Sequence, residues 1–546
     1  MMNIIISAAD YFNRPNIGDN NELWADDFEF VYNSELKSLT YDGESIPVKT
    51  EMDLSNKKYD IEKLKYTLTG VGATLAEPSY DNKTGVLTLV VKGNDWTVDN
   101  QNQHTYKIQF APDPKDVSGD YTRLVKVPIF EQTFSSVNDI NISESSETSV
   151  GVDFLMKDFS FMGVSMGNVE VKGAQLSFGE NGSIDIKSDW QSITLHPDAP
   201  EATDINANVK LTAKVTSEKE LTAEVEIQWD EMSFVVQVGA IPFNTTLEGK
   251  TLKVTGSVAA DEAAAVIPAD ADVNVVDLTE TTLTGDDITA ETFGAKNPNT
   301  LFYAVEGAPL TGNNVVKGTE CDNFVLTDGQ SFNAPEGFTA NQITYKRATA
   351  ASTDEKDEVY TFVLPFTFTA DKVNGRVYEL TGVYDGVLDF TSVTGELEAN
   401  HPYLVVSTGS ELLNNEGLYG EVSATNDLTH EISGGVAMVG AYETTSVKSE
   451  GNESWYGYNA NGQFVKANTG TINPFRTAIK STGSQSSFAL KLDGTVTGIV
   501  NLENPNAKVD VYTISGVCVR KNVPAASALN GLSRGVYIVG GQKVVK

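Results

Sequence analysis

The stretch INANVKLTAKVTSEKELTAEVEIQW, from Ile205 to Trp229, decides the fold class. In its first half every second residue from Val209 to Val215 is apolar, and lysine or threonine fills the positions between. The second half repeats this pattern from Ala223 onward, with glutamate and glutamine between the apolar residues. A period of two places alternate side chains on opposite faces of a strand. We therefore predict an antiparallel hairpin with one buried face and one wet face.

Two further hairpins follow from the same pattern. AQLSFGENGSIDIKS turns at residues 180–182, and its flanks alternate like the first hairpin. The last residues, GLSRGVYIVGGQKVVK, predict a strand over Val536–Val539, a turn at Gly540-Gly541 and a returning strand over Gln542–Val545. For the core of this end region we expect the side chains of Tyr512, Ile514, Val536 and Ile538.

Helical periodicity is weak everywhere in the chain. The best helix candidate is AADEAAAVIPAD, from Ala259 to Asp270, and Pro268 limits its length. We therefore predict an all-β protein, a multidomain array of β-sandwich and β-barrel modules with very little helix. Bulky side chains at Phe154, Val225, Ile227 and Trp229 are expected to fill the barrel and to leave no room for a tight apolar ligand.

Length and charge limit the functions that fit. A chain of 546 residues should split into about three to five domains. The 39 basic and 75 acidic residues give a net charge of −36, which repels nucleic acid and anionic membrane surfaces. No apolar run has the length of a membrane span, and the first residues do not form a convincing signal peptide.

Cysteine and histidine are sparse. Cys321 and Cys518 are far apart, which excludes a disulfide framework and a cysteine-rich metal site. We interpret each of the four scattered histidines as a surface or strand residue rather than a ligand; they are His104, His196, His401 and His430. We accordingly expect no cofactor and no metal.

Composition shifts mark the domain boundaries. Polar or proline-containing stretches such as PDPKDVSGD, KRATAASTDEKDE and NLENPNAK separate the alternating segments. The predicted domains are residues 1–33, 34–113, 114–247, 248–350, 351–500 and 501–546. Of these, 34–113 is predicted as a sandwich, 114–247 as a barrel, 248–350 as an irregular β-rich segment, 351–500 as sandwich-like and 501–546 as a small β-module.

Several segments resemble known modules. LKSLTYDGESIP, SYDNKTGVLTLVVKGNDW and HTYKIQF resemble cadherin-like, immunoglobulin-type sandwiches of bacterial surface proteins, over most of residues 34–113. SGDYTRLVKVPI, VGVDFLMKDFSF and GNVEVKGAQLSF resemble calycin-like (lipocalin-like) barrels of exported Bacteroidetes proteins, over about 118–240. NPNTLFYAVEGAPLTGNNVV and YTFVLPFTFT look like the C-terminal halves of large secreted proteins from the same bacteria.

The two ends of the chain carry further resemblances. ELWADDFEFVYNSEL, residues 22–36, is similar to the last strand of a carbohydrate-related jelly roll, which would make this chain the C-terminal part of a longer protein. The alternative, weighed equally, is that it is simply the first strand of the next domain. KVDVYTISGVCVRKNV with LSRGVYIVGGQKVVK resembles the sorting domains of type IX (Por) secretion. The residues that carry this likeness are Val511, Tyr512, Gly516, Gly535, Tyr537, Lys543 and Lys546.

Three patterns could suggest a functional site. GVSMG, from Gly163 to Gly167, fits G-x-S-x-G, but a nucleophile elbow needs a helix after the serine, and here a strand pattern follows. The adjacent acids Asp26-Asp27 would point to opposite faces of a strand and could not flank one glycosidic bond. Trp455, Tyr456 and Tyr458 are candidates for stacking on sugar rings, although aromatic residues in strands more often belong to the core.

These observations favour a non-catalytic, modular protein, either secreted or on the outer-membrane surface. It would act in adhesion or in binding a host or dietary glycan or protein, and its last module would engage export or anchoring machinery. The alternative is an accessory part of a glycan-active hydrolase whose catalytic domain lies upstream.

Overall fold

The structure is a computed structural model that describes residues 33–70, 72–94, 102–353, 357–459, 462–497, 508–533 and 535–545. Of these, the residues up to 123 and from 138 to 239 form one compact unit, and the remaining residues form the other. Strands dominate both units, and every described helical element is a short 3-10 turn. The all-β prediction is therefore confirmed. The best helix candidate forms only the turn η4, Ala260–Ala265.

Residues 36–111 form two sheets around one core. The first has the order β2-β1-β4 and the second β3-β8-β7-β5, with β6 beside β7. Leu39 of the first sheet and Leu87 and Ile108 of the second are fully buried in this core. The region is a sandwich, and its cadherin-like identity stays a prediction. The strands are β1 Leu36–Tyr41, β2 Glu44–Ile46, β3 Glu51–Lys58, β4 Leu64–Leu68, β5 Thr74–Leu75, β6 Ser79–Asp81, β7 Val86–Lys92 and β8 Gln103–Ala111.

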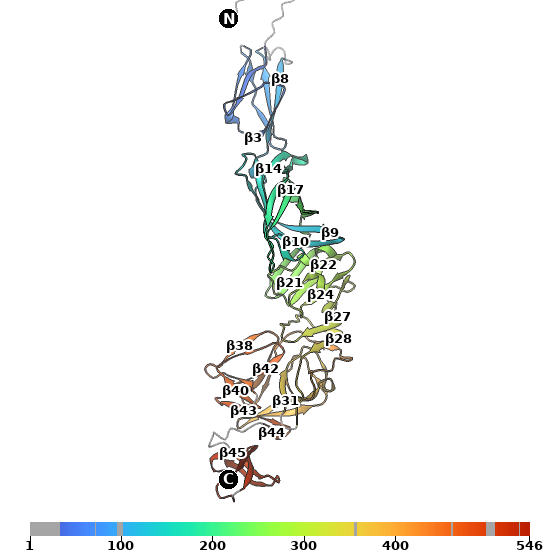
Figure 1. Ribbon diagram of the computed structural model, residues 1–546, viewed down its shortest axis with the longest axis vertical. Helices are drawn as coiled ribbons and strands as arrows, with labels where there is room; N and C mark the ends of the chain where they lie inside the picture. The colour runs from blue at the N-terminus through green and yellow to red at the C-terminus, as the bar shows by residue number, and fades with distance from the viewer. Residues whose placement is uncertain are drawn as a thin grey trace, which may run out of the picture. The chain divides into compact units, whose positions relative to one another are not determined.

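A closed barrel follows the sandwich in the chain. Its strands pair in the order β15-β14-β11-β10-β9-β19-β18-β17, and β17 also pairs with β15, which closes the ring. The short β16, Gln191–Leu195, continues along the same edge of β17. Figure 1 labels β14 and β17 in this barrel. The barrel strands are β9 Gly119–Ile129, β10 Gln132–Glu144, β11 Gly151–Met156, β14 Val169–Phe178, β15 Ile184–Lys187, β17 Ile205–Val215, β18 Leu221–Trp229 and β19 Met232–Gly239.

Both hairpins predicted for this region are confirmed. β17 and β18 pair antiparallel, with Leu211 opposite Val225. β14 and β15 are joined through Asn181 and Gly182, whose φ angles of 56° and 75° suit a tight turn. Phe154, Val225 and Ile227 are fully buried as predicted, whereas Trp229 is half-buried at one end of the barrel.

The segment 248–350 is more regular than the sequence predicts. It supplies most of an eight-stranded sheet with the order β20-β21-β22-β24-β26-β27-β28-β35. β21, β22, β24 and β26 run parallel, as do β27 and β28. A parallel strand that is buried on both faces consists of a continuous apolar run, such as LFYA in β24. Such a run has no alternation of apolar and polar residues, so this criterion does not identify it as a strand. The strands are β20 Phe243–Glu248, β21 Thr251–Ala259, β22 Val275–Thr284, β24 Leu301–Ala304, β26 Val315–Lys317, β27 Glu320–Thr327, β28 Phe338–Lys346 and β35 Gly420–Val422.

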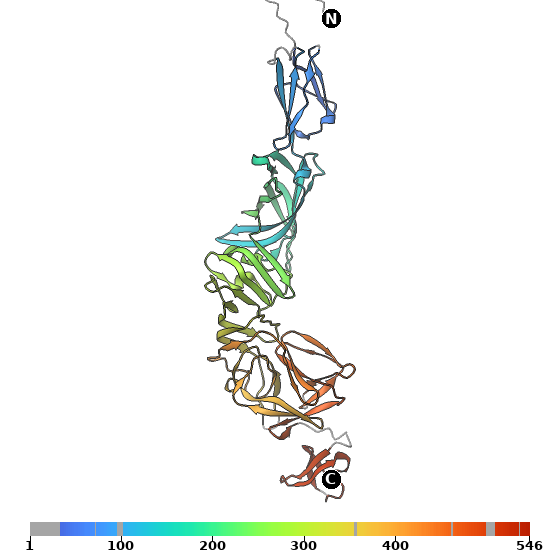
Figure 2. The same ribbon diagram turned by 180° about the vertical axis from the view of Figure 1, so that it is seen from behind.

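An eleven-stranded sheet takes up most of residues 359–497. Its order is β29-β34-β31-β32-β43-β40-β39-β42-β37-β36, with β44 paired to β43. The sheet curls around a core that includes Leu380, Met438 and Phe488, and Figure 2 shows it from behind in yellow to orange. The strands are β29 Val359–Phe362, β31 Gly375–Tyr384, β32 Val387–Val393, β34 Tyr403–Ser407, β36 Thr429–Ile432, β37 Val436–Ala441, β39 Ser454–Tyr458, β40 Gln463–Ala467, β42 Arg476–Ser481, β43 Ser487–Leu492 and β44 Thr495–Thr497.

Each of the two edge strands of this sheet also touches a second strand of the same sheet, with which it forms no backbone ladder. β36 lies against β31, and β29 lies against β42. At the second of these contacts Thr361 Oγ1 accepts a 3.2 Å hydrogen bond from Thr477 N and donates one of 3.3 Å to Thr477 O. Side chains, rather than paired backbones, therefore join the edges.

The end of the chain forms a four-stranded sheet with the order β46-β45-β47-β48. The predicted final hairpin is confirmed, with φ angles of 56° and 84° at its turn glycines. The predicted core is wrong, because Ile514 is 70 % exposed while the other face of the strands supplies the core residues Val509, Val511, Tyr537 and Val539. Both faces are apolar here, so a period of two could not decide which one is buried. The strands are β45 Lys508–Thr513, β46 Cys518–Pro524, β47 Val536–Val539 and β48 Gln542–Val545.

Candidate metal centre

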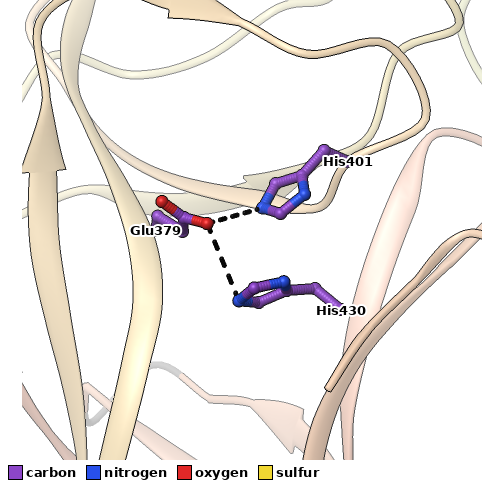
Figure 3. Close-up of side chains that lie close together, drawn as sticks. All are labelled: Glu379, His401 and His430. Carbon is purple, nitrogen blue, oxygen red and sulfur yellow. Dashed lines mark ion pairs between the residues drawn. The ribbon is translucent and has the colours of Figure 1, made fainter. Parts of the chain in front are cut away.

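Three side chains from separate segments meet where β36 approaches β31. Glu379 lies on β31, His401 precedes β34, and His430 lies on β36 (Figure 3). Glu379 Oε1 is 3.2 Å from His401 Nε2 and 3.7 Å from His430 Nε2. One donor atom from each of the three residues lies within 4.8 Å of the other two. It is the only group of three or more histidine, cysteine and acidic residues this close together in the described part of the chain.

The end of a backbone ladder creates the space for this cluster. On one edge of β31, residues Gly375 to Tyr378 pair with β34. From Glu379 onward this edge has no partner in β34. On the other edge, the register with β32 shifts between Leu380 and Gly382. The ring of His430 fills the gap, and its Nε2 donates a 2.8 Å hydrogen bond to the carbonyl oxygen of Leu380.

The position of His401 is fixed by its neighbours. Asn400 adopts a left-handed φ of 61°. Its side chain accepts a 2.7 Å hydrogen bond from Tyr442 Oη and donates one of 2.8 Å to Ala424 O. Pro402 restricts the backbone of His401 to extended conformations. The imidazole ring is therefore held against Tyr403, with 4.7 Å between the two ring centroids.

The cluster is partly buried and carries an unsatisfied nitrogen. Only 15 % of the His401 side chain is exposed, against 36 % of Glu379 and 23 % of His430. Burial lowers the pKa of His401, and the nearby His430 lowers it further, while Glu379 opposes both effects. Nε2 of His401 is buried and makes no well-oriented hydrogen bond, so it faces Glu379 with unused bonding capacity.

From the sequence, all four histidines are expected to be scattered surface or strand residues. His430 does lie on a strand, and the expectation that neither it nor His401 is a ligand stays a prediction. His401 and His430 converge, whereas His104 bonds Ser34 Oγ at 2.7 Å and His196 contacts Asp204 at 2.8 Å on the exposed barrel surface. No sequence spacing signals the cluster, because its members come from segments that meet only when the sheet curls. The proline after His401 was the one local signal of a fixed ring.

The three candidate stacking aromatics do not share a surface. Tyr456 is 1 % exposed, lies in the core of the curled sheet and donates to Gln485 O at 2.9 Å. Tyr458 packs against the same core, where burial raises its pKa to about 12. Trp455 points to the opposite face, and its Nε1 donates to Glu453 Oε1 at 2.8 Å. Glycan stacking by Trp455 and Tyr458 stays a prediction, and Tyr456 is not accessible to a sugar.

GVSMG forms a β-turn region rather than a nucleophile elbow. β12, Ser160–Phe161, and β13, Val164–Ser165, make a two-stranded hairpin, and the next element is the strand β14. Among the described residues, no histidine forms a hydrogen bond with the Ser165 hydroxyl, which accepts a long 3.5 Å contact from Gly167 N. Asp26-Asp27 and the rest of the jelly-roll-like stretch up to residue 32 lie outside the described residues.

The residues of the sorting-like module have mixed positions. Val511 and Tyr537 are buried in its core, and Tyr537 Oη donates to Ser533 O at 2.9 Å. Tyr512 is half-buried on β45, and Gly516 sits in the following turn with a φ of 83°. Gly535 directly precedes β47, the backbone of Lys543 lies on β48, and Lys546 lies outside the described residues.

Comparisons with known proteins add little. Neither a family model nor a curated protein sequence matches this chain. One solved structure, a "putative outer membrane protein" from Bacteroides fragilis NCTC 9343, aligns with 33 % of this chain and 72 % of its own, at 17 % identity and a TM-score of 0.18. Such a low TM-score supports no conclusion about fold or function. No helix among the described residues is long and apolar enough to cross a membrane.

Proposed function

We propose that this chain is a non-catalytic, modular protein of the cell surface or the extracellular space, which acts in adhesion or in binding glycans or proteins. The observation that carries the proposal is the succession of β-modules with their own cores. The sandwich and the four-stranded sheet each enclose a separate hydrophobic cluster, and the curled sheet encloses a third. The role of these modules as spacers and binding units is inferred by analogy from their fold.

The barrel supports a structural role over ligand storage. Phe154, Val225 and Ile227 are fully buried. One end of the barrel carries a surface pocket of about 740 Å³, bordered by Trp229 and Met162 among others. Closed eight-stranded barrels are commonly filled by their own side chains. In this proposal the barrel is a packed module whose outer surface makes the contacts.

The net charge of −36 favours the same role. A strongly negative surface stays soluble and repels polyanions, so neutral or cationic partners are favoured. In this proposal the four-stranded sheet is a folded handle for export or anchoring machinery. Its glycine turns and exposed Ile514 are the parts that such machinery can reach.

An activity assay combined with a binding assay tests the proposal. The full chain and a Ser165→Ala variant are incubated with simple esters and with a panel of glycosides, and we expect no turnover from either protein. The same preparation is applied to glycan and host-protein arrays, where we expect saturable binding. Turnover that is lost in Ser165→Ala, or an absence of binding on every array, would contradict the proposal.

A further inference from the structure

We propose that Glu379, His401 and His430 together bind one divalent transition-metal ion of the Zn²⁺ class. The proposal goes beyond the proposed function and does not depend on it. Two imidazoles and one carboxylate are donors that Zn²⁺, Co²⁺ and Ni²⁺ accept. The hard ions Ca²⁺ and Mg²⁺ prefer sets made only of oxygen atoms.

The spacing of the donor atoms fits a single ion. Ligands about 2.1 Å from a tetrahedral Zn²⁺ lie roughly 3.4 Å from one another. The carboxylate oxygen of Glu379 is 3.2 Å from one imidazole nitrogen and 3.7 Å from the other. Small side-chain rotations would therefore bring all three donors into range. In Figure 3 the carboxylate of Glu379 faces both rings.

The surroundings of His401 favour a ligand over a simple hydrogen bond. Its Nε2 is buried and lacks a well-oriented partner, although Glu379 is close. The ring is positioned by Asn400, Tyr442 and Tyr403, which hold the backbone and one face of the imidazole. Supports of this kind around a histidine keep its lone pair in one direction, which raises metal affinity.

Binding requires one exchange at His430. Its Nε2–H donates to the carbonyl of Leu380, so the neutral ring would change tautomer, with its proton moving from Nε2 to Nδ1 through solvent, and the ion would take the freed Nε2 lone pair. The carbonyl of Leu380 would then accept from water, because the cluster is only partly buried. The remaining coordination positions are open to water or to a donor atom from a partner.

The ion would tie together strands that the backbone does not join. Glu379 belongs to β31 and His430 to the edge strand β36, and these strands touch without a ladder. His401 adds the segment that leads into β34. Because the ion binds the folded arrangement and not the unfolded chain, binding would stabilise the curled sheet.

Calorimetric titration of the chelator-treated full chain with ZnCl₂ tests the proposal. We expect one Zn²⁺ per chain and a higher melting temperature of the curled sheet. Zn²⁺ affinity should fall by about 100-fold or more in each of the variants Glu379→Gln, His401→Gln and His430→Gln. This is more than the loss of affinity expected when a residue that only supports a ligand is replaced. Glutamine at 430 keeps an N–H donor for Leu380, and circular dichroism without metal confirms that each variant folds.

The exposed pair His196–Asp204 supplies the matched control. It has the same imidazole–carboxylate contact, at 2.8 Å, without a second histidine. His196→Gln should leave the Zn²⁺ affinity unchanged, and MgCl₂ should give no comparable heat. X-ray absorption of the Zn²⁺ complex should show two imidazole ligands. The proposal is overturned if the wild-type chain takes up no Zn²⁺ at millimolar concentration, or if the three glutamine variants bind it as tightly as the wild type.

Discussion

The barrel and the eleven-stranded sheet both curl, but they close in different ways. In the barrel, β17 pairs with β15 through four residues from Ile184 to Lys187, so the backbone completes the ring. In the larger sheet the edges meet through side chains, with Thr361 against Thr477 and His430 against the carbonyl of Leu380. A closed ladder satisfies its backbone groups internally, whereas an unclosed edge needs polar side chains to satisfy them.

This difference explains where chemistry gathers in the molecule. Most buried residues of the barrel are apolar, and the buried Asn138 donates its side-chain amide to the carbonyls of Lys157 and Asp158. At the open edge of β31, polar side chains from distant segments converge, and one of them keeps an unsatisfied nitrogen. The candidate metal centre is thus a consequence of incomplete closure.

The largest expected effect comes from emptying the barrel. Phe154 is fully buried, and Phe154→Ala should lower the free energy of unfolding by about 4 kcal/mol through lost burial and a residual cavity. Scanning calorimetry should show this loss in the transition of the barrel, with little dependence on pH. The half-buried Trp229 is the matched control, and Trp229→Ala should cost clearly less. An equal loss of unfolding free energy in both variants would show that the barrel interior around Phe154 is packed no more tightly than the barrel end at Trp229.

A smaller, pH-dependent loss of stability is expected when the ion pair between Asp328 and Arg476 of the curled sheet is removed. Asp328, after β27, accepts two 2.7 Å hydrogen bonds from Arg476 on β42 and one of 2.6 Å from Tyr345. Burial alone would raise the pKa of Asp328, but the bonds from Arg476 and Tyr345 outweigh it and hold that pKa below its usual value. Asp328→Asn leaves a partly buried guanidinium without its carboxylate, and should cost about 3 kcal/mol at pH 7.

The pH dependence of this loss follows from the lowered pKa. A carboxyl group whose folded pKa is depressed contributes its stability above the unfolded value, near pH 4, and loses it as the pH falls toward the folded value. The difference between wild type and Asp328→Asn should therefore shrink below about pH 4 in denaturant titrations. Lys253→Gln, which removes an exposed partner of Glu280, should cause no measurable change. A loss from Asp328→Asn that stays constant from pH 7 to pH 3 would refute the role of the charge.

The sequence was informative where one face of a strand is polar. The alternation in residues 205–229 predicted the barrel hairpin and its buried set, and the glycine pair at 540–541 predicted the final turn. The alternation pattern was not informative where both faces of a strand are apolar. Ile514 was therefore predicted as a core residue, whereas Val511 and Tyr537 form the core. Among the parallel strands of 248–350, β24 is buried along its whole length and offers no alternation to detect.

The candidate site could not be predicted from the sequence. Glu379, His401 and His430 lie on segments brought together by the curl of a sheet whose strand order jumps repeatedly along the chain. Such convergence depends on long-range pairing, which no local pattern encodes. The role of Asn400 and Pro402 in positioning His401 depends on the contact of its ring with Tyr403, which the sequence alone does not show.

Hydrogen–deuterium exchange of the full chain, with and without Zn²⁺, tests most directly whether the two curled sheets close differently. Without metal, we expect the amides of β36 and of residues 379–384 to exchange faster than those of β15 and β17, because only the barrel edge is laddered. Addition of Zn²⁺ should slow exchange in β36 and leave the barrel unchanged, and His430→Gln should abolish that slowing. Protection of β36 equal to that of β15 in the metal-free chain, with no response to Zn²⁺, would contradict the account.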